Sequence, residues 1–217
     1  MKKDFRPICI YIIGSLIATI IATILVRILG FDIKDTELIA ILGTIILYIG
    51  LHIVFGIIYK KKIIEDVKRL NKKDVTLSII FGLLTVAVNI LLSSVIPYES
   101  DNQGQVVDLI MKYKIIGSIA ICICAPVVEE FLFRYSLDTI FKNKWVFIIA
   151  SSLIFGIAHA LDITAIIYIF IGFMLSYSYI KSNKNIVSPI IIHLINNIIS
   201  VLSIFLGFWG VNKKWLT

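Results

Sequence analysis

The chain has 217 residues, of which 59% are hydrophobic and only 16% charged, and its mean hydropathy is +0.98. Soluble domains are about 45–50% apolar and about 25% charged, and a chain of this length cannot cover so much apolar surface by itself. This composition excludes an ordinary soluble domain and predicts an all-α integral membrane protein. The formal net charge of +7 lacks the interleaved basic and aromatic pattern of a nucleic-acid surface, so no nucleic-acid partner is expected.

Seven apolar runs approach the length of about 20 residues that a helix needs to cross the hydrocarbon core. They are unbroken and lack the alternating pattern of a membrane barrel. The predicted spans are residues 8–29, 38–59, 75–96, 115–140, 145–161, 163–180 and 186–209. We therefore expect a polytopic bundle of about seven helices that forms one membrane domain over residues 1–217. Within it, three helices belong to residues 1–114, and a core belongs to residues 115–209.

The first run follows Lys2, Lys3 and Arg6, as the apolar part of a signal peptide would. It is longer than the roughly 7–15 apolar residues of a signal peptide, and no small-x-small cleavage pattern follows it. We therefore predict a retained first helix.

Basic residues in the short connections predict the orientation, because such residues favour the cytoplasmic side. The segment 60–73 carries seven Lys and Arg residues, and with seven spans the N-terminus and the connections at residues 142–144 and 181–184 share its side. The acidic residues of the predicted loop 98–112 fall on the other side, although Lys213 and Lys214 oppose this assignment weakly. We expect a multi-pass protein of the cell membrane with a cytoplasmic N-terminus. The basic segment should also attract anionic headgroups, by about 1 kcal/mol per basic residue near the surface.

Three cysteines, Cys9, Cys122 and Cys124, all lie in apolar runs. Cys122 and Cys124 are two residues apart and point about 200° apart around a helix, so they cannot share a ligand site. They are expected to pack as small apolar side chains, without a disulfide framework.

Two adjacent carboxylates, Glu129 and Glu130, follow the uncharged stretch 115–128 within the fourth span. Because a charge at bilayer depth costs about 2.5–3.5 kcal/mol on insertion scales, such a cluster indicates a functional site. Arg134 lies four residues after Glu130, at the spacing of a helical ion pair. Glu129 is turned about 100° from Glu130, which leaves it free to act as a general base. The alternative is an interfacial charge cluster in which Arg134 snorkels to the surface.

Two later spans carry polar pairs at the spacing of one helical turn. Phe155 and His159 form the first pair, and His193 and Asn197 form the second. Gly156, between the members of the first pair, should permit close approach of a neighbouring helix. Either pair can instead serve as interhelical hydrogen-bonding residues, the role expected for the isolated His52.

The expected depths of these residues agree. Counted from the flanking lysines at 1.5 Å per residue, Glu129 lies about 20 Å deep, His159 about 22 Å and His193 about 14 Å. All three fall toward the middle of a core about 30 Å thick. We therefore expect one carboxylate, two imidazoles and an amide to meet at one level of the membrane.

The three motifs, Glu-Glu-x-x-x-Arg, Phe-x-x-x-His and His-x-x-x-Asn, occur in this order on successive predicted spans. They resemble the CPBP family, which contains the type II CAAX prenyl endopeptidases and the bacterial Abi proteins linked to bacteriocin processing and self-immunity. The resemblance covers residues 115–209, and every motif position is filled. It implies an intramembrane protease whose catalytic residues are Glu129, Glu130, Arg134, Phe155, His159, His193 and Asn197.

The resemblance also implies roles for these residues. Glu129 would activate a water molecule, and Glu130 with Arg134 would position this base. His159 would help to hold the water or a metal, His193 and Asn197 would stabilise the oxyanion or complete the water site, and Phe155 would line the pocket. Family members are often labelled metalloproteases, and Glu129, His159 and His193 could bind zinc with one position open. No His-Glu-x-x-His motif occurs, so we favour a glutamate-activated water; if Glu129 were instead a ligand, Glu130 would be the base.

The Ile- and Lys-rich composition favours a bacterial protein outside the prenyl-protein branch. Its expected substrates are membrane-associated peptides or proteins, such as a peptide pheromone or bacteriocin precursor. Two other classes remain open: a non-catalytic immunity or scaffold protein, and an ion-coupled transporter. The transporter is disfavoured because its two halves should carry matching polar or broken helices, whereas the first three spans offer only His52 and Asn89.

Overall fold

The computed structural model describes residues 4–32, 36–96 and 101–207, which fold into helices joined by turns, with no strand among them. The helices are α1 (Arg6–Ile28), α2 (Thr36–Ile58), α3 (Lys60–Arg69), α4 (Lys72–Val95), α5 (Asp101–Lys112), α6 (Lys114–Ile119), α7 (Ala125–Glu130), α8 (Lys144–His159), α9 (Ala165–Lys181) and α10 (Val187–Phe205). Two π-helical segments, η1 (Ala120–Cys124) and η2 (Phe131–Ser136), flank α7. The predicted all-α fold is confirmed.

Each of the seven predicted apolar runs forms a helix. Five of the described helices are long and apolar enough to cross a membrane, by length and composition: Arg6–Ile28, Leu38–Ile58, Lys72–Val95, Lys114–Ser136 and Val187–Phe205. The other two, α8 and α9, have 16 and 17 residues and are about 24–26 Å long. The fourth span ends at Ser136 rather than at residue 140, and residue 209 of the seventh lies outside the described residues.

Two helices were not predicted from the sequence. The connection predicted at residues 98–112 is helical in its described part, because Asp101–Lys112 forms α5. Val107 and Ile110 of this helix are buried against Cys122, Val201 and Ile204. A helix of only three turns is marginal by itself and depends on the surface that it covers, although Val106, Val107 and Ile110 share one face. The second unpredicted helix, α3, lies within the basic segment 60–73.

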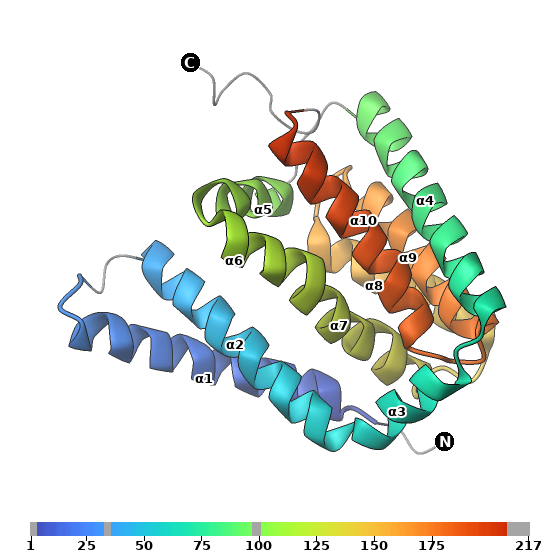
Figure 1. Cartoon of the computed structure of the whole chain (residues 1–217), viewed down its shortest axis with the longest axis horizontal. Helices are drawn as coiled ribbons and strands as arrows, with labels where there is room; N and C mark the ends of the chain where they lie inside the picture. The colour runs from blue at the N-terminus through green and yellow to red at the C-terminus, as the bar shows by residue number, and fades with distance from the viewer. Residues whose placement is uncertain (1–3, 33–35, 97–100, 208–217) are drawn as a thin grey trace.

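The helices form two hairpins around a central rod, which is the run of α6, η1, α7 and η2 (Figure 1). The α1–α2 hairpin lies along one side, where Leu51 and Phe55 of α2 pack on Val128 and Phe131 of the rod. The α8–α9 hairpin, α4 and α10 form the opposite side, with α10 in contact with both α4 and α9. The rod, which carries the two glutamates, is therefore enclosed from both sides.

Glycines allow α8 and α9 to approach closely. A Cβ atom on Gly156 would lie 2.3 Å from Ile169 Cγ1, and one on Gly172 would lie 3.0 Å from Ser152 Cα. Both positions therefore exclude larger residues at this backbone separation. The close contact expected at Gly156 is present, and it fixes the helix that ends in His159.

Pro126 accounts for the first irregular segment of the rod. The Ala125 N–H bonds to the Ala120 carbonyl, five residues back. In the same register the next N–H would bond to the Ile121 carbonyl, but residue 126 is proline and has no N–H. The rod therefore contains a backbone carbonyl that needs a donor from elsewhere.

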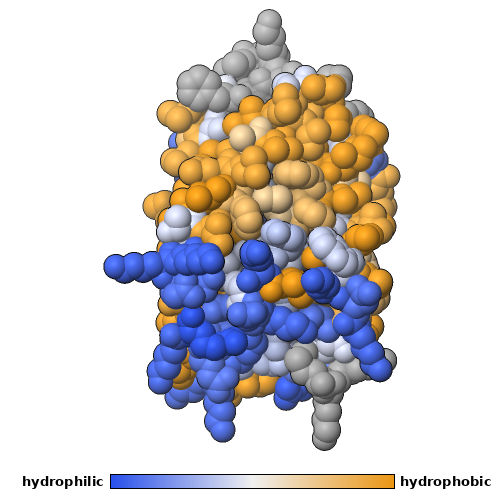
Figure 2. Space-filling model, turned by 90° about the vertical axis from the view of Figure 1, so that its right-hand side faces the viewer, coloured by the Kyte–Doolittle hydropathy of each residue, from blue (hydrophilic) through white to orange (hydrophobic). Residues whose placement is uncertain are grey.

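The polar side chains gather at one end of the bundle, where α3 lies. Figure 2 shows this hydrophilic end below a broad apolar surface. Asp4 N–H donates to Thr139 Oγ1 at 2.9 Å, and Tyr135 Oη donates to the Asp4 carboxylate at 3.2 Å. The Arg6 side chain also donates to Asp4 and lowers the pKa of that carboxyl. These contacts bind the beginning of α1 to the end of η2.

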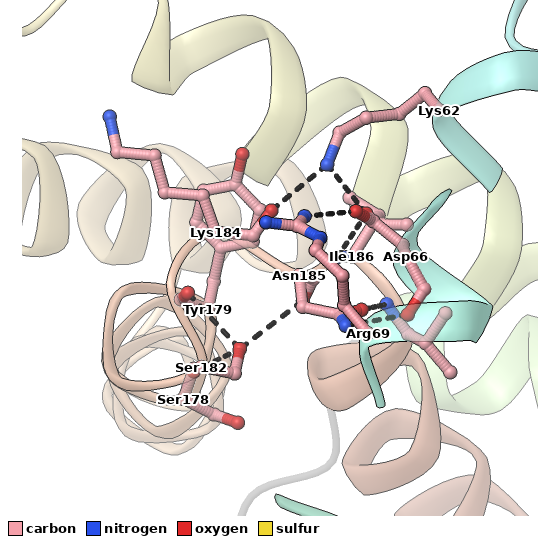
Figure 3. A network of polar contacts seen from close by, with 10 residues as sticks. Lys62, Asp66, Arg69, Ser178, Tyr179, Ser182, Lys184, Asn185 and Ile186 are labelled. Carbon is pink, nitrogen blue, oxygen red and sulfur yellow. Dashed lines mark hydrogen bonds and ion pairs between the residues drawn. The ribbon is translucent and has the colours of Figure 1, made fainter. Parts of the chain in front are cut away.

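Asp66 is the centre of a polar network at this end (Figure 3). Its side chain is fully buried and accepts from Lys62 Nζ at 2.5 Å, from Arg69, and from the Ile186 N–H at 2.9 Å. The Asp66 carbonyl accepts from Asn185 Nδ2 at 2.8 Å. The network thereby joins α3 to the turn between α9 and α10.

Replacing Asp66 with alanine should destabilise the protein by about 2–4 kcal/mol, because two cations lose their common partner and the Ile186 N–H is left unpaired. The melting temperature can be measured in detergent by a thiol-reactive fluorophore in a Cys9→Ser/Cys124→Ser background, because Cys9 is exposed and Cys124 partly exposed, whereas Cys122 is buried until the bundle opens. Glu65→Ala on the exposed face of α3 is the control. Equal melting temperatures for the two variants would contradict the prediction.

Candidate active site

Glu129 lies opposite two imidazoles at the middle of the bundle. Its Oε2 atom is 3.4 Å from His159 Nε2, at the end of α8, and 3.9 Å from His193 Nε2, on α10. The side chains of Glu129 and His159 are 21% and 18% exposed, whereas that of His193 is 5% exposed. The structure therefore brings together the carboxylate and both histidines of the three motifs, and leaves the carboxylate partly accessible.

The other nitrogen of each imidazole faces an acceptor. His159 Nδ1 is 2.8 Å from the Phe155 carbonyl, and His193 Nδ1 is 2.9 Å from Glu130 Oε1. Since a carbonyl and an ionised carboxylate only accept, both Nδ1 atoms are assigned as protonated donors. In a neutral imidazole the remaining Nε2 then carries a lone pair. Both Nε2 atoms lie near Glu129 Oε2, so a proton or a hydrogen-bond donor is needed between these groups.

Glu130 and Arg134 form the ion pair that their spacing indicates. Arg134 Nε lies 3.1 Å from Glu130 Oε2, and both side chains are fully buried. The contact is an ion pair without a hydrogen bond, because neither Arg134 Nε nor Glu130 Oε2 has a hydrogen-bond partner among the described residues. The alternative in which Arg134 snorkels to the surface is wrong for this structure.

Arg134 is further held by α8. Its Nη1 atom donates to Ser151 Oγ at 3.3 Å, and Ser151 Oγ donates to the Phe133 carbonyl at 2.7 Å. The guanidinium lies 4.8 Å from the centre of the Phe155 ring, within the range of a cation–π contact. Ser151 was not predicted from the sequence, although Ser151, Phe155 and His159 follow one another at four-residue spacing on one face of a helix.

Two aromatic rings flank His159. The Phe155 ring centre is 4.2 Å from the imidazole centre, and Tyr168 of α9 stacks on it at 5.0 Å and 25°. Phe155 is itself 1% exposed, and its ring centre is 5.8 Å from that of His193. Tyr168 was also missed, since its sequence neighbours give no signal and only the α8–α9 hairpin places it there.

Asn197 is placed apart from the carboxylates and imidazoles. Its Nδ2 atom donates to the Ile121 carbonyl at 2.9 Å, which is the carbonyl that Pro126 leaves without a donor. Its Oδ1 atom accepts from Asn196 Nδ2 at 3.3 Å, and Asn89 Nδ2 lies 3.5 Å from Asn196 Oδ1. The amide therefore supports the distorted rod and continues a polar chain to α4.

The remaining candidates lie outside this cluster. His52 Nδ1 is 2.7 Å from the Tyr48 carbonyl of its own helix, and the three cysteines are free. Within residues 4–32, 36–96 and 101–207, no group of three or more His, Cys, Asp or Glu residues is arranged to hold a metal ion. Binding of zinc by Glu129, His159 and His193 stays a prediction.

Replacing Asn197 with alanine should lower the free energy of unfolding by about 1–3 kcal/mol, because the Ile121 carbonyl loses its donor. Ser203→Ala on the same helix is the control, since among the described residues Ser203 Oγ bonds to the Ser200 carbonyl of its own helix alone. Thermal unfolding monitored through the buried Cys122 separates the two. An unchanged melting temperature for Asn197→Ala would show that the amide does not support the rod.

Comparison with known proteins agrees with the three motifs. Residues 112–199 match the family model described as "Type II CAAX prenyl endopeptidase Rce1-like". No curated protein and no solved structure matches the chain. The matched segment contains all three motifs, from Glu129 to Asn197, whereas α1 to α4 lie before it. This part of the chain, with the carboxylates, histidines and asparagine of the motifs, is therefore similar to the Rce1-like type II CAAX prenyl endopeptidases over residues 112–199.

Proposed function

We propose that this protein is an intramembrane endopeptidase that hydrolyses membrane-associated peptides or proteins with a water molecule activated by Glu129. The proposal rests on the burial of Glu129 Oε2 and on the groups that surround this atom. This atom is buried and has no hydrogen-bond partner among the described residues, yet two imidazole nitrogens lie within 3.9 Å of it. A carboxylate oxygen in such a position can accept a proton from water.

The charges of the cluster support one protonated imidazole. Glu129, Glu130 and Arg134 together carry one net negative charge, so a single imidazolium makes the buried group neutral. His159 is the better candidate because it is closer to Glu129 and lies between two aromatic rings, which favour a cation. In the resting enzyme its Nε2–H is directed at Glu129.

The reaction then follows from the positions of these groups. Glu129 takes a proton from water as the water oxygen forms a bond to the carbonyl carbon of the substrate. The Nε2–H of the imidazolium stabilises the oxyanion that develops on the carbonyl oxygen. Glu129 then returns its proton to the leaving amine as the C–N bond breaks. The products are a carboxyl and an amine, and the cluster regains its initial charge.

Glu130 acts through His193 and Arg134. It accepts from His193 Nδ1–H at 2.9 Å and pairs with Arg134 at 3.1 Å, so it fixes the imidazole with Nε2 toward Glu129. Its side chain is fully buried and cannot reach a substrate. We therefore propose Glu129 as the base and Glu130 as a positioning residue.

The substrate class follows from the location of the site. Long apolar helices with exposed Ile and Leu side chains surround it, so a substrate must approach in or along the membrane. We propose a peptide or protein held at the membrane of a bacterial cell, such as a pheromone or bacteriocin precursor. The N-terminus and α3 are proposed to face the cytoplasm.

Glu129→Gln should reduce proteolysis by about 10²- to 10⁴-fold, because the amide cannot take the proton of water. The test is made in cells without the native gene that express wild type, Glu129→Gln or the exposed control Glu65→Gln at equal levels. Peptides with new N-termini in the membrane fraction are then identified by mass spectrometry. Termini that require Glu129 and persist in Glu65→Gln define the substrates. If Glu129→Gln is folded and retains full biological activity, the chain is a binding or immunity protein instead.

Tyr168 gives a second test, because the proposal uses its ring rather than its hydroxyl. Tyr168→Phe should keep kcat, whereas Tyr168→Leu should lower it by about 3- to 10-fold with little change in KM, since a cation–π contact contributes about 1 kcal/mol. The kinetics are measured on a substrate found in the preceding experiment. Equal kcat values for the Phe and Leu variants would exclude a cationic His159 supported by this ring.

A further inference from the structure

The helix α3 lies at the boundary between membrane and water. It begins at Lys60, two residues after the apolar helix that ends at Ile58, and the next apolar helix begins at Lys72. Figure 1 shows α3 connecting the ends of α2 and α4 at the polar end of the bundle. The apolar helices before and after α3 are both long enough to span the bilayer. Because α3 has only ten residues between them, it must lie at the membrane surface.

We propose that α3 is a docking surface for the headgroups of anionic phospholipids. Its outward face carries the side chains that such a surface requires. Lys60, Lys61 and Lys68 are exposed, and no ion pair engages them in the described part of the chain. Glu65 is the one acidic residue on this exposed face of α3. The face therefore keeps an excess of positive charge that lipid phosphates can neutralise.

Apolar side chains lie between these lysines. Ile64 is 42% exposed and Val67 is 56% exposed. Ile64 is four residues from both Lys60 and Lys68 and three from Lys61, so it lies on the helix surface next to all of them. A helix in the plane of the interface inserts such side chains below the headgroups while its lysines stay at the level of the phosphates. The pattern matches a bilayer better than a soluble acidic partner, which would leave Ile64 and Val67 in water.

The cations on the inward face of α3 have a structural role, unlike the exposed lysines that are proposed to bind lipid. Lys62 and Arg69 are both bound to the buried Asp66, and Lys62 also donates to the Lys184 carbonyl at 3.0 Å (Figure 3). These two side chains are therefore already engaged. The Asp66 network also fixes α3 on the α9–α10 turn. Lys60, Lys61 and Lys68 can therefore contact lipid headgroups without further ordering of the backbone.

The test measures lipid binding by the full chain. Wild type is reconstituted in nanodiscs of phosphatidylcholine and phosphatidylglycerol, and the enrichment of spin-labelled phosphatidylglycerol next to the protein is measured by electron spin resonance. The test variant is Lys60→Gln/Lys61→Gln/Lys68→Gln. The control is Lys142→Gln/Lys144→Gln/Lys181→Gln, which removes three exposed lysines at the same end, from the turn before α8, from α8 and from α9. Thermal unfolding establishes that all three proteins are folded.

We expect the test variant to lose most of the enrichment, by roughly threefold or more, and the control to retain it. The enrichment of wild type should also decrease with salt. Equal losses in both variants would mean that net charge alone attracts the lipid, and an unchanged enrichment in the test variant would mean that α3 does not bind it; either result overturns the proposal. No proteolysis is measured, so the outcome is independent of the proposed function.

Discussion

The arrangement of this site depends on the burial of one ion pair. Glu130 and Arg134 are both fully buried, 3.1 Å apart, and neither charge is tolerable in an apolar bundle without the other. Their remaining contacts join the rod to two other helices, because Glu130 accepts from His193 of α10 and Arg134 donates to Ser151 of α8. The pair that neutralises the interior thus also sets the positions of the two helices that carry the imidazoles.

The two neighbouring glutamates differ because of what surrounds each of them. Glu130 has its charge balanced by Arg134 and its second oxygen bound to His193. Glu129 has one imidazole nitrogen at 3.4 Å and a buried oxygen without a hydrogen bond among the described residues. Glu130 is therefore bound on both oxygens, whereas Glu129 keeps an oxygen without a hydrogen bond among the described residues. The π-helical segments on both sides of α7 fit this assignment, since such segments frequently occur at functional sites.

The polar end of the bundle supports the site from a distance. Asp66 bonds to the Ile186 N–H, directly before α10, and His193 lies two turns further along that helix. The α9–α10 turn contains Asn183 and Lys184 at positive φ, which non-glycine residues rarely adopt. A buried carboxylate on α3 thus helps to hold both an uncommon turn and the start of a helix that carries a candidate catalytic residue.

The sequence by itself determined the membrane class, the seven apolar helices and the Glu130–Arg134 pair, because these depend on hydropathy and on spacing within one helix. It also singled out the carboxylate and the two histidines, since polar residues in apolar runs are few enough to be examined one by one. Only the tertiary structure placed Ser151 and Tyr168 beside them, identified Asn197 as the donor to Ile121, and formed α3 and α5 as helices. The contacts of Ser151 with Arg134 and of Tyr168 with His159 depend on segments far apart in the chain. The donor to the Ile121 carbonyl depends on a backbone register interrupted at Pro126, which spacing within one helix does not encode.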